Sequence, residues 1–221
     1  PNRKDKAGRT PLFNAMDNPH IVKLLLKYGT DPNCKDKEGR TALFNATNPH
    51  IVKLLLEHGA DLNCQDEDGK TALLHAIGRA THIISCLLEH GADPNCQDED
   101  GRTALYYVRD PHIIKCLLEH GADPIIKDNS GRTPLLNATN PQIVKLLLEH
   151  GADPNCQDKD GRNPLFNARD PLTVKYLLEH SADPNCKDKD GETPLFWARD
   201  LLIVKCLIEN GADPNIIKKD G

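Results

Sequence analysis

Apolar and polar positions alternate in blocks along the chain, and the blocks recur at a nearly fixed distance. The apolar run IVKLLL at 51–56 is followed by the polar stretch EHGADLNCQDEDG at 57–69. The segments 47–66 and 139–158 share this pattern almost letter for letter and differ only at His50 against Gln142 and Leu62 against Pro154. Repetition with a period of about 20 to 50 residues is typical of solenoid and propeller folds.

The glycine of the phrase D-x-x-G measures the period. Successive intervals are 31, 30, 32, 30, 30, 30 and 30 residues, and the glycines are Gly8, Gly39, Gly69, Gly101, Gly131, Gly161, Gly191 and Gly221. This predicts about seven repeats and a fragment at each end, in a single array over residues 1–221. The chain starts inside a repeat, at Pro1, so we expect the array to be part of a longer chain.

Each repeat carries two signals for the start of a helix. The first is Thr-Pro or Thr-Ala, as at 10–11 and 41–42, or Asn-Pro at 163–164. The side-chain oxygen is expected to cap free N–H groups, and Pro loses nothing at the first helical position. The second signal is Asn-Pro or Asp-Pro, as at 48–49 and 170–171. A second helix is therefore predicted to follow the first after a very short turn.

The second helix is predicted to end at a glycine such as Gly59, the usual left-handed residue after a helix. Histidines such as His58 and His150 precede this stop, where positive charge suits the helix dipole. Ser181 replaces the glycine in one repeat, which predicts a local cost of about 1 kcal/mol. One such helix pair buries too little apolar surface to offset the entropy of ordering about 30 residues. Stacking closes the gap, which predicts an elongated all-α solenoid of helix-turn-helix repeats.

Composition narrows the partners and the compartment. Hydrophobic residues make up 38% and charged residues 28% of the chain, and the formal net charge is -5. That balance argues against nucleic acid as a partner, because phosphate binding needs a concentrated basic face. No apolar run approaches the roughly 18 to 20 residues of a membrane span, so no membrane partner is expected. Eight cysteines recur mostly one per repeat, too far apart for disulfides. Free thiols predict a reducing intracellular location, the cytoplasm, with the nucleus or a host-cell cytosol as alternatives.

The phrase D-x-x-G-R-T-P-L, followed by Ala and then I-V-K-L-L-L-E-H-G-A-D-P-N, resembles the ankyrin repeat over essentially the whole chain. The resemblance implies paired antiparallel helices with turns projecting at one edge. It also implies a concave groove, lined by the first helices and turn tips, that binds other proteins. Most repeats here have 30 residues against about 33 in the family, and the insertion GRAT at 78–81 partly restores the length of one repeat. Apolar packing is expected where the family has a histidine, at Phe13, Phe44, Leu74, Tyr106, Leu136, Phe166 and Phe196.

Catalytic and metal chemistry are not expected. His, Cys and Asp recur at fixed repeat positions, so their simplest role is structural. Closely spaced Cys or His pairs of the zinc-binding kind are missing from the sequence. We therefore expect a protein that is not an enzyme and needs no cofactor.

The first helix offers candidate binding residues. With about 100° per residue, the second position after the predicted core leucine should face outward, onto the groove by resemblance. Asparagine dominates this position, while large amphipathic residues of the kind found in binding hot spots break the row. The residues are Asn14, Asn45, His75, Tyr107, Asn137, Asn167 and Trp197. The alternative is that His75, Tyr107 and Trp197 pack on a neighbouring repeat.

A basic row follows the turn glycine and offers a second candidate. Its members are Arg9, Arg40, Lys70, Arg102, Arg132 and Arg162, and the row ends at Glu192. One reading is a track for an acidic peptide. The other is pairing with nearby turn acids such as Asp36, Asp66 and Asp98, or simple solvation.

The resemblance also implies a possible modification. The asparagine in the turn after the second helix can be a substrate of asparaginyl hydroxylases in ankyrin proteins. The matching residues are Asn33, Asn63, Asn95, Asn155, Asn185 and Asn215.

Three functions stay open at this point. The first is a monomeric interaction module for a protein or peptide partner. The second is the targeting segment of a larger enzyme or effector. The third is a structural or engineered repeat protein without a natural partner.

Overall fold

The computed structural model describes residues 2–79 and 81–216. Ala80 of the GRAT insertion and Gly221, which marks the last predicted fragment, lie outside the described residues. The fold is all-α, and no strand occurs in the part of the chain that is described.

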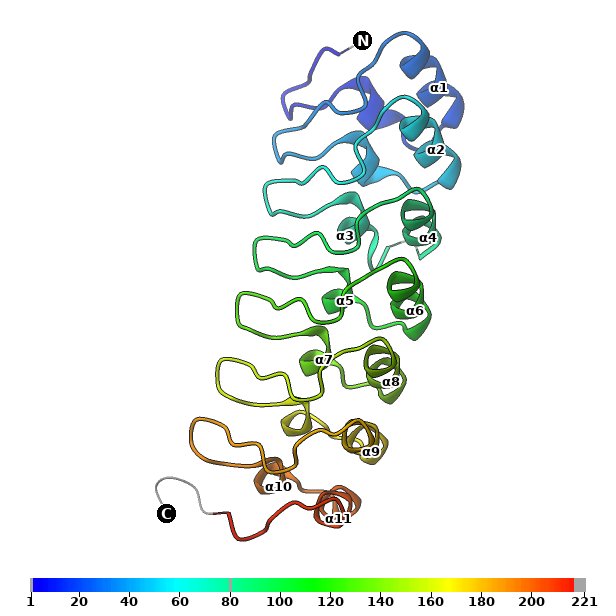
Figure 1. Cartoon of the computed structure of the whole chain (residues 1–221). Helices are drawn as coiled ribbons and strands as arrows, with labels where there is room; N and C mark the ends of the chain where they lie inside the picture. The colour runs from blue at the N-terminus through cyan, green and yellow to red at the C-terminus, as the bar shows by residue number, and fades with distance from the viewer. Residues whose placement is uncertain (1, 80, 217–221) are drawn as a thin grey trace. The chain divides into compact units, whose positions relative to one another are not determined.

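The chain forms two compact units. The first comprises residues 1–108 and 119–122, and the second comprises residues 109–118 and 123–221. Within each unit, turn loops extend on the side of the short first helices and away from the longer second helices (Figure 1). One continuous array over 1–221 stays a prediction.

The expected pair of helices is confirmed in every described repeat. The first helices are short and partly of 3-10 type, namely η1 (Pro11–Ala15), η2 (Ala42–Asn45), α3 (Ala72–Ala76), α5 (Ala104–Tyr107), α7 (Pro134–Asn137), η3 (Pro164–Phe166) and α10 (Pro194–Trp197). The second helices are all nine residues long, namely α1 (Pro19–Lys27), α2 (Pro49–Glu57), α4 (Thr81–Glu89), α6 (Pro111–Glu119), α8 (Pro141–Glu149), α9 (Pro171–Glu179) and α11 (Leu201–Glu209).

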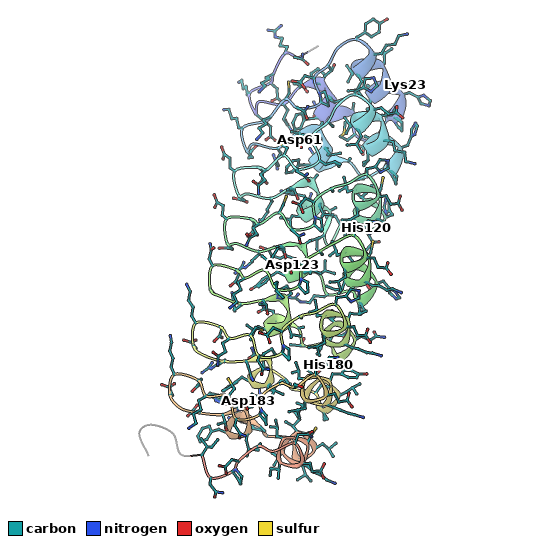
Figure 2. The ribbon with its side chains drawn as sticks, in the orientation of Figure 1. Lys23, Asp61, His120, Asp123, His180 and Asp183 are labelled. Carbon is teal, nitrogen blue, oxygen red and sulfur yellow. The ribbon has the colours of Figure 1, made fainter. Side chains whose placement is uncertain are left out.

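Both ends of the second helix are capped as the sequence predicts. At the start of α2, the Asn48 side chain accepts a hydrogen bond from the His50 N–H at 2.9 Å. At its end, His58 Nδ1 lies 2.8 Å from the Leu54 carbonyl. A carbonyl can only accept, so the ring nitrogen donates, and the histidine satisfies one of the free carbonyls of the last turn. His90, His150 and His180 make the same contact, and Figure 2 shows His180 at the end of α9.

The expected threonine caps of the first helices are wrong in most repeats. Thr71 alone among the described threonines at this position caps with its side chain, accepting from the Leu74 N–H at 3.4 Å. Elsewhere the backbone carbonyl takes this role, as when Thr41 accepts from the Phe44 N–H at 3.2 Å. These helices are only three to five residues long. The N–H three positions after the threonine donates a 3-10 hydrogen bond to the threonine carbonyl, and this is the N–H that the hydroxyl would otherwise have bound.

The core follows the predicted apolar stripe. Leu12, Ile51 and Leu55 are fully buried, and apolar packing at the family's histidine position holds in five of the seven repeats. Those buried residues are Phe13, Phe44, Leu74, Leu136 and Phe166. Tyr106 is half-buried, and Phe196 is 61% exposed, because no further repeat of described residues covers the last helix pair.

Ser181 adopts the left-handed conformation that the sequence predicts for it, with φ 68°. A side chain at the equivalent Gly59 or Gly151 would meet nothing within 4 Å, so the cost of serine is conformational and not steric. We expect Ser181→Gly to raise the free energy of unfolding by about 0.5 to 1 kcal/mol. Urea denaturation followed by circular dichroism checks this. Ser181→Ala keeps the strain and should give no gain; equal gains in both variants would contradict the explanation.

Neighbouring loops are joined by asparagine side chains. Asn33 Nδ2 donates to the Gly59 carbonyl at 2.8 Å, and Asn33 Oδ1 accepts from the Asp61 N–H at 2.8 Å. Asn155 and Asn185 make the same two bonds to the next loop, and Asp61 and Asp183 mark these loops in Figure 2. Each bridge ties one repeat to the next through two amide hydrogen bonds.

The asparagine series is interrupted at Ile125. Its side chain is 53% exposed, and an aliphatic group can neither donate to Gly151 nor accept from Asp153 as an asparagine would. The turns that follow are also joined less closely. In the first unit, Glu67 N–H donates to the Glu38 carbonyl at 3.0 Å, whereas among the described residues no such bond joins Lys159 to the preceding turn. Inter-repeat coupling in the second unit is therefore weakest at this loop.

Restoring the bridge should stabilise the second unit. We expect Ile125→Asn to raise the free energy of unfolding by about 1 to 2 kcal/mol, because two amide hydrogen bonds form and a half-exposed apolar side chain is lost at little cost. Urea denaturation measures the change. Ile125→Ser, which is polar but too short to reach Gly151, serves as the matched control. A similar gain from serine would mean that exposure of Ile125, not the missing bridge, limits stability.

Candidate interaction surface

The basic row is engaged in ion pairs within the turns. Arg40 Nη2 lies 2.8 Å from Asp36 Oδ2, and Asp36 Oδ1 accepts the Glu38 and Arg40 N–H groups. The hydrogen bond that the Arg40 guanidinium donates to Asp36 raises the pKa of Arg40. Arg9 with Asp5 and Arg132 with Asp128 repeat this pairing at 3.0 Å. These contacts favour the pairing interpretation of the row over a free track for an acidic peptide.

His75 and Tyr107 bind the turn aspartate in two repeats whose basic side chain forms an ion pair with another acid of the turn. Lys70 lies 3.5 Å from the exposed Asp68, and His75 Nε2 instead lies 2.7 Å from Asp66 Oδ2. In the next repeat Arg102 pairs with Asp100, and the Tyr107 hydroxyl donates to Asp98 Oδ2 at 2.5 Å. Burial, together with this bond to Asp98, raises the pKa of Tyr107. Two of the three residues that break the asparagine row are therefore structural partners of the turn.

Tyr107→Phe should separate this structural role from recognition. Removing the hydroxyl leaves Asp98 Oδ2 without that bond, so we expect the free energy of unfolding to fall by about 1 to 2 kcal/mol. Thermal or urea denaturation measures the loss. Tyr28→Phe is the control, because Tyr28 is exposed and its hydroxyl forms no hydrogen bond among the described residues. Equal stability of wild type and Tyr107→Phe would contradict the structural assignment.

Arg162 and Trp197 form a contact between consecutive repeats. Glu192 stands where the last described repeat would have its own arginine, and Arg162 Nε reaches across to Asp188 Oδ2 at 3.3 Å. The same guanidinium lies over the Trp197 ring, 5.3 Å from its centroid. Trp197 is half-buried, and its Nε1 is buried without an acceptor among the described residues. Its indole therefore serves packing on one face while another part lines a pocket.

The asparagines of the first helices differ in exposure. Asn14, Asn45 and Asn167 are exposed, and Asn137 is half-buried. Asn137 Nδ2 donates to the Thr133 carbonyl at 3.3 Å, and Asn167 Nδ2 donates to the Leu136 carbonyl of the previous repeat at 3.1 Å. Asn14 and Asn45 are therefore the members of this row best placed to meet a partner.

Two pockets lie beside the insertion at 78–81 in the first unit. One has a volume of about 310 Å³ and is lined by Lys70, His75 and Tyr107 among others. The other, of about 160 Å³, includes Phe44 and His75, whose rings lie 5.1 Å apart. Arg79 lines both pockets, is exposed, and has no side-chain partner among the described residues. The arrangement can accept an apolar side chain next to an unpaired guanidinium.

Sequence reasoning did not single out three arginines that line pockets. Arg79 belongs to the insertion at 78–81, which the sequence pattern groups with His75 and Tyr107 as one possible epitope without naming this arginine. Arg169 and Arg199 hold the same position in the last two described repeats, within the phrase A-R-D, where other repeats have Asp17, Thr47, Arg109 or Thr139. Comparing this position between repeats would have found them.

The candidate hydroxylation residues are the loop-bridging asparagines. Both ends of the amide are bonded to the next repeat at Asn33, Asn155 and Asn185. Asn63 accepts from the Asp93 N–H, Asn95 donates to the Gly121 carbonyl, and Asn215 N–H donates within its own loop. Hydroxylation of these residues stays a prediction.

The thiols carry no sign of activation. None of the eight cysteines forms a disulfide, and burial, followed by the charge of Asp93, raises the pKa of Cys96 to about 11. Burial likewise raises the pKa of Cys86, Cys156 and Cys186. These groups are protonated at neutral pH and are poor nucleophiles.

Among the described residues no group of three or more His, Cys, Asp or Glu is placed to hold a metal. In the same part of the chain, no helix has the length and apolar character of a membrane span.

Helix pairs stacked through bridged loops, with pockets on the side of the first helices, define a helical repeat protein of the interaction-scaffold class. The family model described as ankyrin repeats (3 copies) matches residues 1–66, 45–128, 78–158 and 137–218. The chain belongs to the ankyrin repeat family. Its fold is the ankyrin repeat solenoid that the sequence pattern predicts, and the family consists of non-enzymatic interaction domains.

A solved structure supports the same assignment. The crystal structure of the ankyrin repeat domain of Bcl-3, a unique member of the IkappaB protein family, is similar to this chain with a TM-score of 0.80 and 31% sequence identity. The match covers 92% of this chain and 100% of that one. A search of the curated proteins gives no match.

Proposed function

We propose that the chain is a non-catalytic, monomeric scaffold that binds a partner protein or peptide on the side of its first helices and turn tips. The observation that carries this proposal is the pair of pockets around His75 and Arg79. They lie where the repeat pattern is broken, at the insertion 78–81. Eight cysteines without a disulfide support a reducing intracellular location such as the cytoplasm.

The side chains at this surface suit protein recognition. Aromatic and arginine residues dominate binding hot spots, especially beside pockets that exclude water. Arg79 combines exposure with the lack of an internal partner, so it can pair with a carboxylate of a partner without breaking an ion pair first. Tyr107 and Phe44 supply apolar area on either side of it.

A capture experiment tests this function. Wild-type protein, Arg79→Glu and Arg3→Glu are used as baits in lysate of the source cells, and bound proteins are identified by mass spectrometry. Arg3 is exposed and makes no side-chain contact among the described residues, so its variant matches the charge change away from the pockets. We expect proteins that wild type and Arg3→Glu retain and Arg79→Glu loses. Equal capture by all three would move the site elsewhere, and no specific capture would favour a structural spacer.

A further inference from the structure

A pocket of about 470 Å³ in the second unit lies between its last two described repeats. It is formed where the first helix of each repeat leads into the second. Arg169 comes from one repeat and Arg199 from the next, while Trp197 and Ile203 line the pocket between them. The proposed function does not use this pocket.

The two arginines have no carboxylate partner. Both are exposed, and no ion pair or side-chain hydrogen bond to Arg169 or Arg199 occurs among the described residues. The acids that follow them in the sequence are occupied by the helix starts. Asp170 Oδ1 accepts the Leu172 and Thr173 N–H groups, and Asp200 Oδ1 accepts those of Leu202 and Ile203. The turn arginines, by contrast, are already paired, as Arg162 is with Asp188.

The charge of the pocket favours an anion. Asp200 lines it together with the two guanidinium groups, so one carboxylate faces two cations. Arginine binds carboxylates through paired N–H groups with fixed geometry. The formal net charge of the chain is -5, so this pocket is a local positive site on an acidic protein. A polyanionic nucleic acid would meet repulsion outside the pocket, whereas a short acidic peptide would not.

Part of the pocket lining is apolar. Ala168 and Ile203 are buried, and Trp197 is covered by Arg162 on one side while it lines the pocket. In a peptide that has an apolar side chain between two acidic ones, the apolar group would therefore contact this part of the lining while the carboxylates pair with the two arginines. Neighbouring helix pairs stack about 10 Å apart, and three residues of polyproline II conformation span about 9 Å while returning to the same face. Acidic residues three positions apart match the spacing of consecutive repeats.

We propose that this pocket binds an extended peptide in which two acidic residues, three positions apart, flank an apolar residue. The acidic side chains pair with Arg169 and Arg199, and the apolar side chain lies against Trp197. This inference rests on the proposed scaffold function and assigns a class of partner to a pocket of the second unit.

Fluorescence anisotropy with the full chain tests it. The probe is a fluorescein-labelled peptide, Gly-Ser-Glu-Leu-Pro-Glu-Ser-Gly, and its control replaces both glutamates by glutamine. The variant is Arg169→Gln with Arg199→Gln. The matched control is Lys175→Gln with Lys205→Gln, which removes the same charge from the second helices of the same two repeats, where these lysines pair with Glu179 and Glu209 at 3.7 Å. We expect at least tenfold weaker binding for the arginine variant and less than a twofold change for the lysine variant, with circular dichroism unchanged in both.

Any of four results would overturn the inference. Three of them are no binding of the peptide to wild type, equal weakening by the arginine and lysine variants, and equal binding of the glutamine peptide. A fourth is tighter binding of an oligothymidylate than of the peptide, which would identify the pocket as a nucleic-acid site. The capture experiment with Arg79→Glu tests a different pocket, in the first unit. If that experiment identifies partners and the peptide does not bind the second unit, the proposed function stands and only this inference is wrong.

Discussion

Alanine in place of Gly69 is expected to lower the free energy of unfolding of the first unit by about 3 kcal/mol. Gly69 has φ +73°, and a methyl group there would lie 2.9 Å from the Glu99 nitrogen and 3.1 Å from the Asp98 carbonyl carbon. The left-handed conformation costs about 1 to 2 kcal/mol for an L-residue, and overpacking against rigid backbone costs about 1 to 3 kcal/mol more. The Glu99 N–H donates to the Asp68 carbonyl at 3.0 Å, so separating the turns to relieve the clash also weakens that bond.

Gly131→Ala is the matched control for this result. Gly131 occupies the same turn position with φ +78°, but its methyl group would lie 3.7 Å from both the side chain and the backbone nitrogen of Lys159, an ordinary van der Waals distance. Only the conformational cost of about 1 kcal/mol applies there. Urea denaturation of both variants measures the difference. Equal losses would show that the close approach of successive turns contributes nothing.

Asp36→Ala is expected to cost a similar amount, about 3 to 4 kcal/mol. Its side chain is fully buried, its Oδ1 accepts the Glu38 and Arg40 N–H groups, and its Oδ2 accepts from Arg40 at 2.8 Å. Hydrogen bonds to a charged group contribute about 1.5 to 3 kcal/mol each. The substitution removes the acceptor of the turn backbone and leaves the Arg40 guanidinium with only Glu38.

Asp36→Asn divides this loss into two parts. Asparagine keeps the oxygen that accepts from the turn backbone and loses the negative charge that pairs with Arg40, so about half the loss is expected. Asp158→Ala is a second comparison, because Asp158 accepts the same two N–H groups of its own turn while Arg162 pairs with Asp188. Stability is again read by urea denaturation. If Asp36→Asn cost as much as Asp36→Ala, the ion pair and not the turn would be the main stabilising element.

Local chemistry explains what the sequence could predict. The period, the second helices and their caps depend on contacts between residues a few positions apart, as between Asn48 and His50 or between His58 and Leu54. Ser181 was predicted to be left-handed for the same reason, because the stop signal lies within one turn of the helix. Each of these features can be derived from a single repeat.

Features that depend on two repeats together were not predictable in the same way. The threonine caps failed because the first helices are too short to need the hydroxyl, a length set by how the pair packs. The ion pair between Arg162 and Asp188 cannot be predicted from the repeat of Arg162 alone. It depends on the next repeat, where Glu192 replaces the arginine that would otherwise pair with Asp188. His75 and Tyr107 stood out as candidate binding residues, whereas their bonds to Asp66 and Asp98 depend on where Lys70 and Arg102 point.

Ile125 has a consequence for how the second unit loses its structure. In a linear array, stability is approximately the sum of the intrinsic terms of the repeats and the coupling terms between neighbours. Where one coupling term is small, the free-energy cost of separating folded from unfolded repeats is lowest, so partial unfolding starts at that interface. The asparagine bridges at Asn155 and Asn185 keep the following repeats in one cooperative block. A single aliphatic residue thus sets the length over which unfolding of this unit is all-or-none.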